Sequence, residues 1–117
     1  MTLEDRDAAY LWDMLQAARE VAGMTSDVAI TGFTENIMLC RATERCLEII
    51  GESARRISDI CKSTHHEIPW RDIIGQRNII AHEYGQIDYE LLYKTAVDDI
   101  PVLIVNLEVI LSVIDYQ

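Results

Sequence analysis

Residues 40–61, CRATERCLEIIGESARRISDIC, decide the fold. Small or apolar side chains recur in this stretch at alternating intervals of three and four residues: Cys40, Thr43, Leu47, Ile50, Ala54, Ile57 and Cys61. This spacing predicts one long helix with a continuous buried seam. A second apolar stripe, Leu39, Cys46, Ile49 and Ile60, runs beside it. A helix with two buried stripes is either the central helix of its own core or one that also packs against a second copy, and the sequence leaves both open.

The segments before this stretch predict a first helix and a loop. Thr2 and Asp5 resemble a capping box, Leu11, Leu15, Ala18 and Ala22 follow at helical spacing, and Gly23 is expected to end this helix, which should span about 3–22. Residues 23–33 are predicted to form a loop. Thr34 should cap the long helix, with Phe33 and Met38 as its hydrophobic staple.

The segments after it predict two further helices. Residues 62–68 are polar, Pro69 suits a first helical turn, and the helix should carry Trp70, Ile73, Ile74, Ile79 and Ile80 and stop at Gly85. Asp88 should cap the last helix, with Ile87 and Leu92 as its staple and a seam at Ala96, Ile100, Leu103, Leu107, Ile110 and Ile114. Pro101 should kink or split it. The prediction is an all-α, up-down bundle of four to five helices, forming a single domain over residues 1–117.

The charge distribution limits the kind of partner. The net charge is −10, yet residues 41–77 hold seven of the ten basic residues against six acids, so that this segment carries +1 and the rest −11. A broad basic groove for nucleic acid is therefore excluded, because phosphate contacts supply most non-specific affinity. A small local site for an anion remains compatible with the sequence. The alternative is a solvated helix face of mixed charge.

Other features point to a cytoplasmic protein without a metal or cofactor. The start of the chain lacks the basic and apolar regions of a secretory signal, and the apolar stretch 100–114 is too short for a membrane span. The three cysteines form no C-x-x-C pair and are predicted to be buried thiols. His65 and His66 fall in a polar loop without a recognisable zinc pattern, so solvated side chains are expected there.

Residues 76–84, QRNIIAHEY, carry the side chains best suited to phosphate and proton chemistry. On a helix, Asn78 and His82 share one face, while Arg77 and Tyr84 share another. Arg77 and His82 diverge by about 140°. One copy would thus form a splayed site, whereas two copies about a two-fold axis could close a pocket with two Arg and two His. The alternative from spacing alone is an ion-paired helix end beside Glu83.

A two-copy pocket suits RNA cleavage. One histidine would take the proton of the 2′-hydroxyl, the other would protonate the leaving oxygen, and the arginines would stabilise the charge on the phosphorane. Glu52 is expected to support the pocket rather than react, because it lies four residues before Arg56 and is suited to an ion pair. The alternative for Glu52 is a solvated surface acid.

The pattern R-N-x-x-x-H-x-Y at Arg77, Asn78, His82 and Tyr84 resembles the signature of HepT-like toxins of the HEPN superfamily. Residues 49–54, IIGESA, resemble the I-G-E-A-A segment of that family, with Ser53 in place of Ala, and residues 68–73, IPWRDI, resemble its P-W-R lead-in. The likeness runs from the first helix to the region of Pro101.

The resemblance implies a homodimer with a composite site at its two-fold axis, metal-independent endoribonuclease activity, and an antitoxin partner of the minimal nucleotidyltransferase type, with which it could assemble further. It also implies that this partner transfers AMP to Tyr84; a buried core tyrosine is the alternative. Two other functions remain open: a non-catalytic helical module that docks a nucleotidyltransferase, and a purely structural dimer. The identity of the RNA does not follow from the sequence.

Overall fold

The computed structural model describes residues 3–75 and 88–114 of the chain. Helices form nearly all of these ranges: α1 (Leu3–Thr25), α2 (Ile30–Thr34), α3 (Ile37–Arg56), α4 (Asp59–Thr64), a helical segment at 70–75, α6 (Tyr89–Lys94), the π-helical turn η1 (Thr95–Asp99) and α7 (Ile100–Ile114). No strand occurs in the described ranges. The predicted all-α fold is therefore confirmed.

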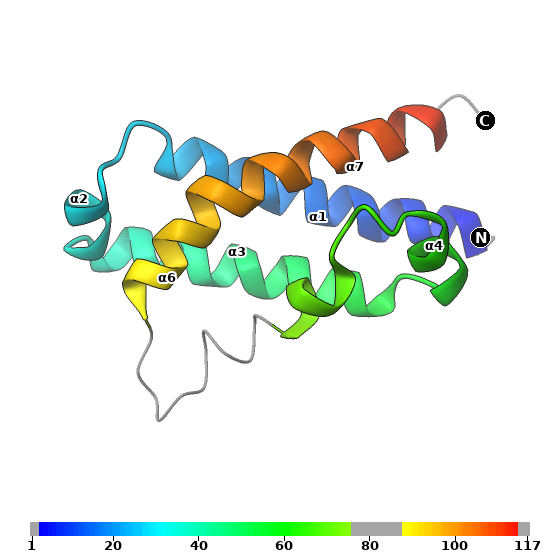
Figure 1. Cartoon of the computed structure of the whole chain (residues 1–117), viewed down its shortest axis with the longest axis horizontal. Coiled ribbons are helices and arrows are strands. Elements are labelled where there is room, and N and C mark those ends of the chain that lie inside the picture. Colours follow the sequence, from blue (N-terminus) through cyan, green and yellow to red (C-terminus); the bar gives the residue numbers. More distant parts are fainter. Residues whose placement is uncertain (1–2, 76–87, 115–117) are drawn as a thin grey trace.

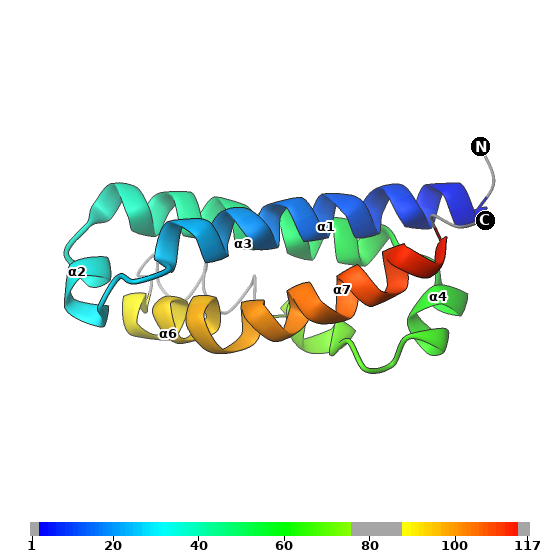
Figure 2. The ribbon, with the colours of Figure 1, turned by 90° about the horizontal axis from the view of Figure 1, so that it is seen from above.

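The helices pack in two layers. Figure 2 shows α1 and α3 side by side in one layer, with α6, η1 and α7 forming an almost continuous line across the other. The chain runs down α1, back along α3 and again in the direction of α3 along α6 and α7 (Figure 1). The start of α1, the end of α7 and α4 all lie at one end of the bundle, while α2 and α6 lie at the other.

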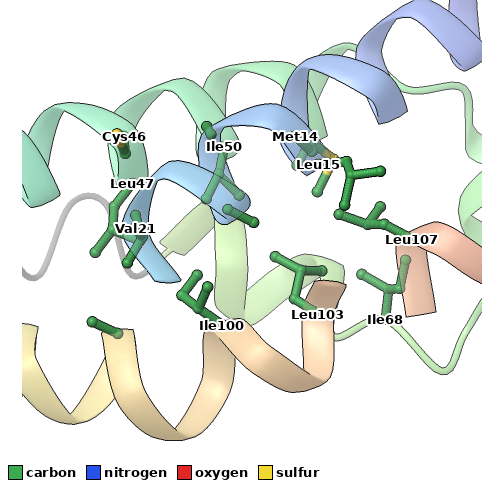
Figure 3. Close-up of a cluster of buried hydrophobic side chains, with 14 of the residues drawn as sticks. Met14, Leu15, Val21, Cys46, Leu47, Ile50, Ile68, Ile100, Leu103 and Leu107 are labelled. Carbon is green, nitrogen blue, oxygen red and sulfur yellow. The ribbon is translucent and has the colours of Figure 1, made fainter. Parts of the chain in front are cut away.

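The core lies between these layers. Figure 3 shows Leu15 of α1, Ile50 of α3 and Leu107 of α7 meeting there, and none of the three is more than 2% exposed. Most of the predicted seam positions on the three long helices are buried; Cys61, Ala22 and Ile114 are only half-buried. The second predicted stripe is partly used within the same chain, since Cys46 of α3 is buried, whereas Ile60, which lies on α4, is 73% exposed.

The first helix is longer than predicted. It continues through Gly23 to Thr25, because Met24 still packs against the core and Thr25 is buried with its hydroxyl donating to the carbonyl of Val21. The helix ends instead near Asp27, whose φ of 64° lies in the left-handed region. Asparagine and aspartate tolerate this conformation better than most residues.

The predicted loop and cap before α3 are also corrected. Residues 30–34 form the short helix α2, which buries Phe33. The N-cap of α3 is Asn36 rather than Thr34, and its side chain accepts a hydrogen bond from the amide of Leu39 at 3.0 Å. Met38 is 80% exposed, so the staple with Phe33 does not form. The ring of Phe33 packs against Tyr93 instead, with 5.4 Å between centroids.

The predicted long helix over 40–61 is broken near its end. Ile57 and Ser58 adopt extended backbone conformations, and Ser58 caps the separate helix α4 by accepting from the amide of Cys61. The break is held by Asp7 of α1, whose carboxylate accepts from the amide and from the hydroxyl of Ser58 at 2.9 and 2.5 Å. A contact across 51 residues of sequence thus decides where α3 ends.

Pro101 neither splits nor ends its helix. The turn before it is the π-helical η1, in which the amide of Ile100 donates to the carbonyl of Thr95, five residues earlier. Because proline lacks an amide hydrogen and its ring needs space, a widened turn just before it lets the helix continue. In the described ranges, no helix combines the length and apolarity needed to cross a membrane.

Candidate active site

The predicted reactive residues, Arg77, Asn78, His82 and Tyr84, lie outside the described residues, as do Glu83 and Gly85. The structure describes the two elements that flank residues 76–87 and the helix α3 that carries Glu52. These elements determine how the chain enters and leaves the candidate segment.

The entry is a firmly anchored helical segment at 70–75. Its first turn forms at Pro69, as predicted, and the carbonyl of Pro69 accepts from the amide of Ile73 at 3.0 Å. Ile68 and Trp70 are 1% and 8% exposed, and the Trp70 indole donates from Nε1 to the carbonyl of His65 at 3.0 Å. The P-W motif is therefore a structural anchor that fixes the start of the helix leading into 76–87.

The exit is the capped start of α6. Asp88 is its N-cap, as predicted, and its carboxylate accepts from the amide of Leu91 at 3.0 Å. Leu92 is fully buried, and the Tyr93 hydroxyl donates to the carbonyl of Val28 at 2.7 Å. The described residues on either side of 76–87 thus belong to the same helical bundle.

A cavity of about 250 Å³ lies beside the entry helix. It is lined by α3 through Leu47 and Ile50, by residues 69–73, and by η1 and α7. Its polar lining includes the carboxylates of Asp72 and Asp99, and its described lining contains no basic side chain. The two acidic residues in the described lining disfavour the binding of a phosphate by like-charge repulsion.

Glu52 forms a different ion pair from the one predicted. Its Oε1 lies 3.9 Å from Nη1 of Arg55, three residues later, whereas the sequence pointed to Arg56. The side chain is 38% exposed. The pair is too exposed and too long to contribute much to stability, since surface pairs are worth about 0–1 kcal/mol. A role for Glu52 in the pocket stays a prediction.

The arginines of α3 form a face of mixed charge. Arg41, Arg45 and Arg55 are each more than half exposed, and each lies within 4 Å of a glutamate three positions away: Glu44 at 3.6 Å, Glu48 at 3.2 Å and Glu52 at 3.9 Å. Each of these three positive charges therefore has a negative neighbour on the same helix. The solvated mixed-charge face expected as an alternative is what this part of the chain presents.

Glu44 is a half-buried acidic residue that sequence reasoning missed. Its Oε2 and the hydroxyl of Thr43 are buried without a hydrogen-bond partner among the described residues. Burial raises the pKa of Glu44, and the nearby Arg41 only partly offsets this effect. Its position four residues after Cys40, beside the apolar seam of α3, could have indicated this burial. Glu44 therefore affects the charge balance of α3, and no contact among the described residues links it to the candidate site.

The other titratable groups in the described part of the chain form no cluster suited to metal binding or nucleophilic catalysis. His65 lies 3.5 Å from Glu67, and His66 is exposed. Across 3–75 and 88–114, no cluster of three His, Cys, Asp or Glu residues could hold a metal ion. All three cysteines are free thiols with a raised pKa, and burial together with the hydrogen bond to Glu20 raises that of Cys46 to about 11. Such thiols are poor nucleophiles at neutral pH.

Comparisons with known proteins point to one family. A family model described as "Ribonuclease HepT-like" matches residues 14–110. The chain is 37% identical over 102 residues to a Methanocaldococcus jannaschii protein named "Putative RNase MJ1380", covering 87% of this chain and 94% of that protein. It is 35% identical over 94 residues to a Thermococcus cleftensis protein named "Probable ribonuclease HepT", covering 80% of this chain and 86% of that one. No solved structure matches the chain significantly.

Proposed function

The chain belongs to the HepT-like ribonuclease family and is a ribonuclease, and on this premise we propose that it is the toxin of a toxin–antitoxin pair that cuts RNA without a metal ion. The observation that carries the proposal is the family match across residues 14–110, which includes the whole R-N-x-x-x-H-x-Y pattern at 77–84. The same match gives less weight to a non-catalytic docking module or a structural dimer.

Arg77 and His82 are the proposed catalytic residues. The histidine of one copy removes the proton from the 2′-hydroxyl, and the 2′-oxygen then attacks phosphorus. The histidine of the other copy donates a proton to the departing 5′-oxygen. The arginine guanidinium groups stabilise the added negative charge on the phosphorane. The products are a 2′,3′-cyclic phosphate and a 5′-hydroxyl, and no bond change in this sequence calls for a metal ion.

A homodimer is part of the proposal, because Arg77 and His82 diverge on an ideal helix and converge only with the help of a second copy. Asn78 shares a helix face with His82 and is proposed to orient it or to bind phosphate. Glu52 is proposed to order the basic side chains near the pocket, in line with its position on α3 and its ion pair with Arg55.

Tyr84 is the proposed point of control. A partner nucleotidyltransferase would transfer AMP from ATP to the phenolic oxygen, with release of pyrophosphate. Because Tyr84 and Arg77 share a helix face, the added phosphodiester would lie near the arginine, occupy its phosphate site and repel an incoming RNA backbone. The prediction is that Tyr84→Phe stays active and resists neutralisation by ATP and the partner enzyme. Full silencing of this variant would show that binding alone inhibits.

The test of the proposed activity uses the purified chain in EDTA with a labelled RNA stem–loop and with total cellular RNA. Cleavage should persist in chelator and leave 2′,3′-cyclic phosphate ends. Arg77→Ala and His82→Ala should each lower the rate by at least about 100-fold, the usual range for a lost acid–base or oxyanion group.

His66→Ala is the matched control, because His66 is an exposed loop histidine. It should leave the rate unchanged. Loss of cleavage in chelator would contradict the metal-independent route. Wild-type rates in both Arg77→Ala and His82→Ala would refute the assigned residues. A mixed dimer of wild-type and His82→Ala chains with full activity in each pocket would refute the composite site.

A further inference from the structure

The outward face of α7 carries an apolar stripe. Val102, Val105, Val109 and Val113 are each 58–61% exposed. They follow one another at intervals of three, four and four residues, so they lie along one side of the helix over about 16 Å. The opposite side of α7 is the core side, with Leu103, Leu107 and Ile110 buried against the bundle.

This outward face differs from those of the other long helices. The exposed positions of α1 include Asp5, Arg6, Asp13, Arg19 and Glu20, and α3 exposes four arginines. Among the exposed positions of α7, only Glu108 is charged, and it already forms an ion pair with Arg19 of α1 at 2.8 Å. A helix that is apolar on every side is expected to be covered on every side. In Figure 1 the C-terminal half of α7 runs along the upper edge of the molecule, and no described element is drawn above it.

We infer that two copies of this chain associate through the valine face of α7, which is defined by Val102, Val105, Val109 and Val113. The two α7 helices would be antiparallel, and the two-fold axis would cross the valine face at the level of residue 107. The inference deepens the proposed homodimer by naming its surface. Its link to RNA cleavage rests on the proposed function.

The spacing of the valines favours a second copy as the occupant. Val105 and Val109 lie two residues on either side of Leu107, and Val102 and Val113 lie five and six residues from it. A two-fold axis at Leu107 therefore places Val105 opposite Val109 of the second copy, and Val102 opposite Val113. A two-fold interface must be complementary to itself, and this stripe meets that condition along its length.

The charge distribution of the chain also favours a second copy as the partner bound at the valine face. The chain carries −10, so two copies repel each other wherever their acidic surfaces meet. The valine face brings together only neutral side chains over three helical turns, with Asn106 half-buried at its border. Valine also loses little side-chain freedom on burial, because its χ1 angle is already restricted, and its small size allows two helices to approach closely. Self-association through this face therefore brings no charged side chains of the stripe together.

The valine face also lies next to the helical segment at 70–75 that precedes the candidate site residues. Val102 lines the same cavity as Asp72 and Ile73 of the helical segment that leads into residues 76–87. A second copy bound at the valine face would therefore lie beside that segment. This proximity explains how association could complete a site that one copy leaves splayed.

The test combines a repulsive variant with a charge-swapped partner. Val105→Glu/Val109→Glu places glutamates opposite one another across the proposed interface, and it should weaken association by on the order of 1,000-fold. Sedimentation equilibrium at micromolar concentration should give twice 13.4 kDa for the wild-type chain and 13.4 kDa for this variant. Val105→Lys/Val109→Lys should also be monomeric alone. Mixed with the glutamate variant, it should restore a dimer, because each glutamate then faces a lysine.

Met38→Glu/Ile60→Glu is the matched control, since it replaces two exposed apolar residues elsewhere, 80% and 73% exposed, and should remain dimeric. Circular dichroism checks that each variant keeps its helices. A dimer that survives in the glutamate variant would overturn the inference, and so would a monomeric wild-type chain. An α7 face that binds only a nucleotidyltransferase, with the wild type monomeric alone, also counts against it. A folded monomer that cleaves RNA at the wild-type rate would support the surface but refute the composite site.

Discussion

Asp7 is a buried carboxylate that ties α1 to the break between α3 and α4. The side chain is 6% exposed, and it accepts two hydrogen bonds from Ser58, one from the amide and one from the hydroxyl. Ser58 in turn caps α4 by accepting from Cys61. Asp7→Ala removes both acceptors and leaves the Ser58 amide without its partner at a bend that aims the chain toward residues 65–75.

The cost of this change can be estimated from the contact. Hydrogen bonds to a charged group contribute about 1.5–3 kcal/mol each. Ser58 is only half-buried, so water replaces part of what is lost, and we expect Asp7→Ala to lower the free energy of unfolding by about 2–4 kcal/mol. For a chain of this size, about 4 °C of melting temperature corresponds to 1 kcal/mol, which predicts a fall of about 8–16 °C.

Urea unfolding followed by circular dichroism measures this difference. Asp13→Ala is the matched control, because Asp13 is an exposed aspartate on the same helix and the same substitution has the same effect on helix propensity. Ser58→Ala and the double variant complete a cycle that isolates the coupling of the two side chains, expected at about 1–2 kcal/mol. If Asp7→Ala loses no more stability than Asp13→Ala, the contact does not hold the α3–α4 junction.

Three further predictions concern stability. Burial raises the pKa of Glu44, so the folded state binds the carboxyl proton more tightly than the unfolded state does. The free energy of unfolding should therefore fall as the pH rises from the pKa of an unfolded glutamate, near 4.3, through the higher pKa of the folded state. Glu44→Gln should therefore melt above the wild type at pH 7 and level with it below pH 4, and an equal or lower melting temperature at pH 7 would refute this. Leu107→Ala, at a fully buried position, should cost about 2–5 kcal/mol in urea unfolding, and a loss under 1 kcal/mol would mean that the core is not centred there. Trp70→Phe keeps a ring but loses the bond to the His65 carbonyl, and it should cost about 0.5–1.5 kcal/mol and slow cleavage, whereas unchanged stability would show that this bond contributes nothing.

Local signals in the sequence predicted much of the fold. Asp88 caps a helix through its own side chain, and Pro69 begins one through its fixed φ, so both were predictable from a few neighbouring residues. The buried seams followed from periodicity alone. These features depend on interactions between residues within one or two helical turns. The packing of distant segments therefore leaves them unchanged.

The errors occur where distant parts of the chain meet. Gly23 is a common helix end, yet packing of the next two residues extends α1 beyond it. The end of α3 is fixed by Asp7, far away in sequence, and the spacing of the seam continues through Ser58 without any sign of a break. Pro101 was expected to disturb its helix, and the disturbance is absorbed one turn earlier by η1. Periodicity contains neither the tertiary contacts that set the ends of α1 and α3 nor the widened turn that accommodates Pro101.

The candidate site, like the fold, has one part that could be predicted from the sequence and one part that could not. The motif at Arg77 and His82 is local and could be recognised from residue types and order. The chemistry proposed for it would need a second chain, and one sequence does not state which surface that chain would cover. The valines of α7 recur in the sequence at intervals of three and four residues, but so do the core residues of the same, mostly apolar segment, and the sequence does not distinguish the two sets. Only the fold separates its core side from its outer side.

The charge of the described surface bears on the size of the RNA that this enzyme can recognise. Arg41, Arg45 and Arg55 of α3 each have a glutamate neighbour, so an RNA phosphate bound there must compete with a carboxylate. Counterion release along such a face is small, and affinity for long RNA should therefore be weak and should depend little on salt. Selectivity then has to come from the few groups near the cleaved bond, and in the proposed dimer two copies of Arg77 would contribute two phosphate contacts. A short structured end or loop, held at the junction of two copies, suits this arrangement better than an extended strand.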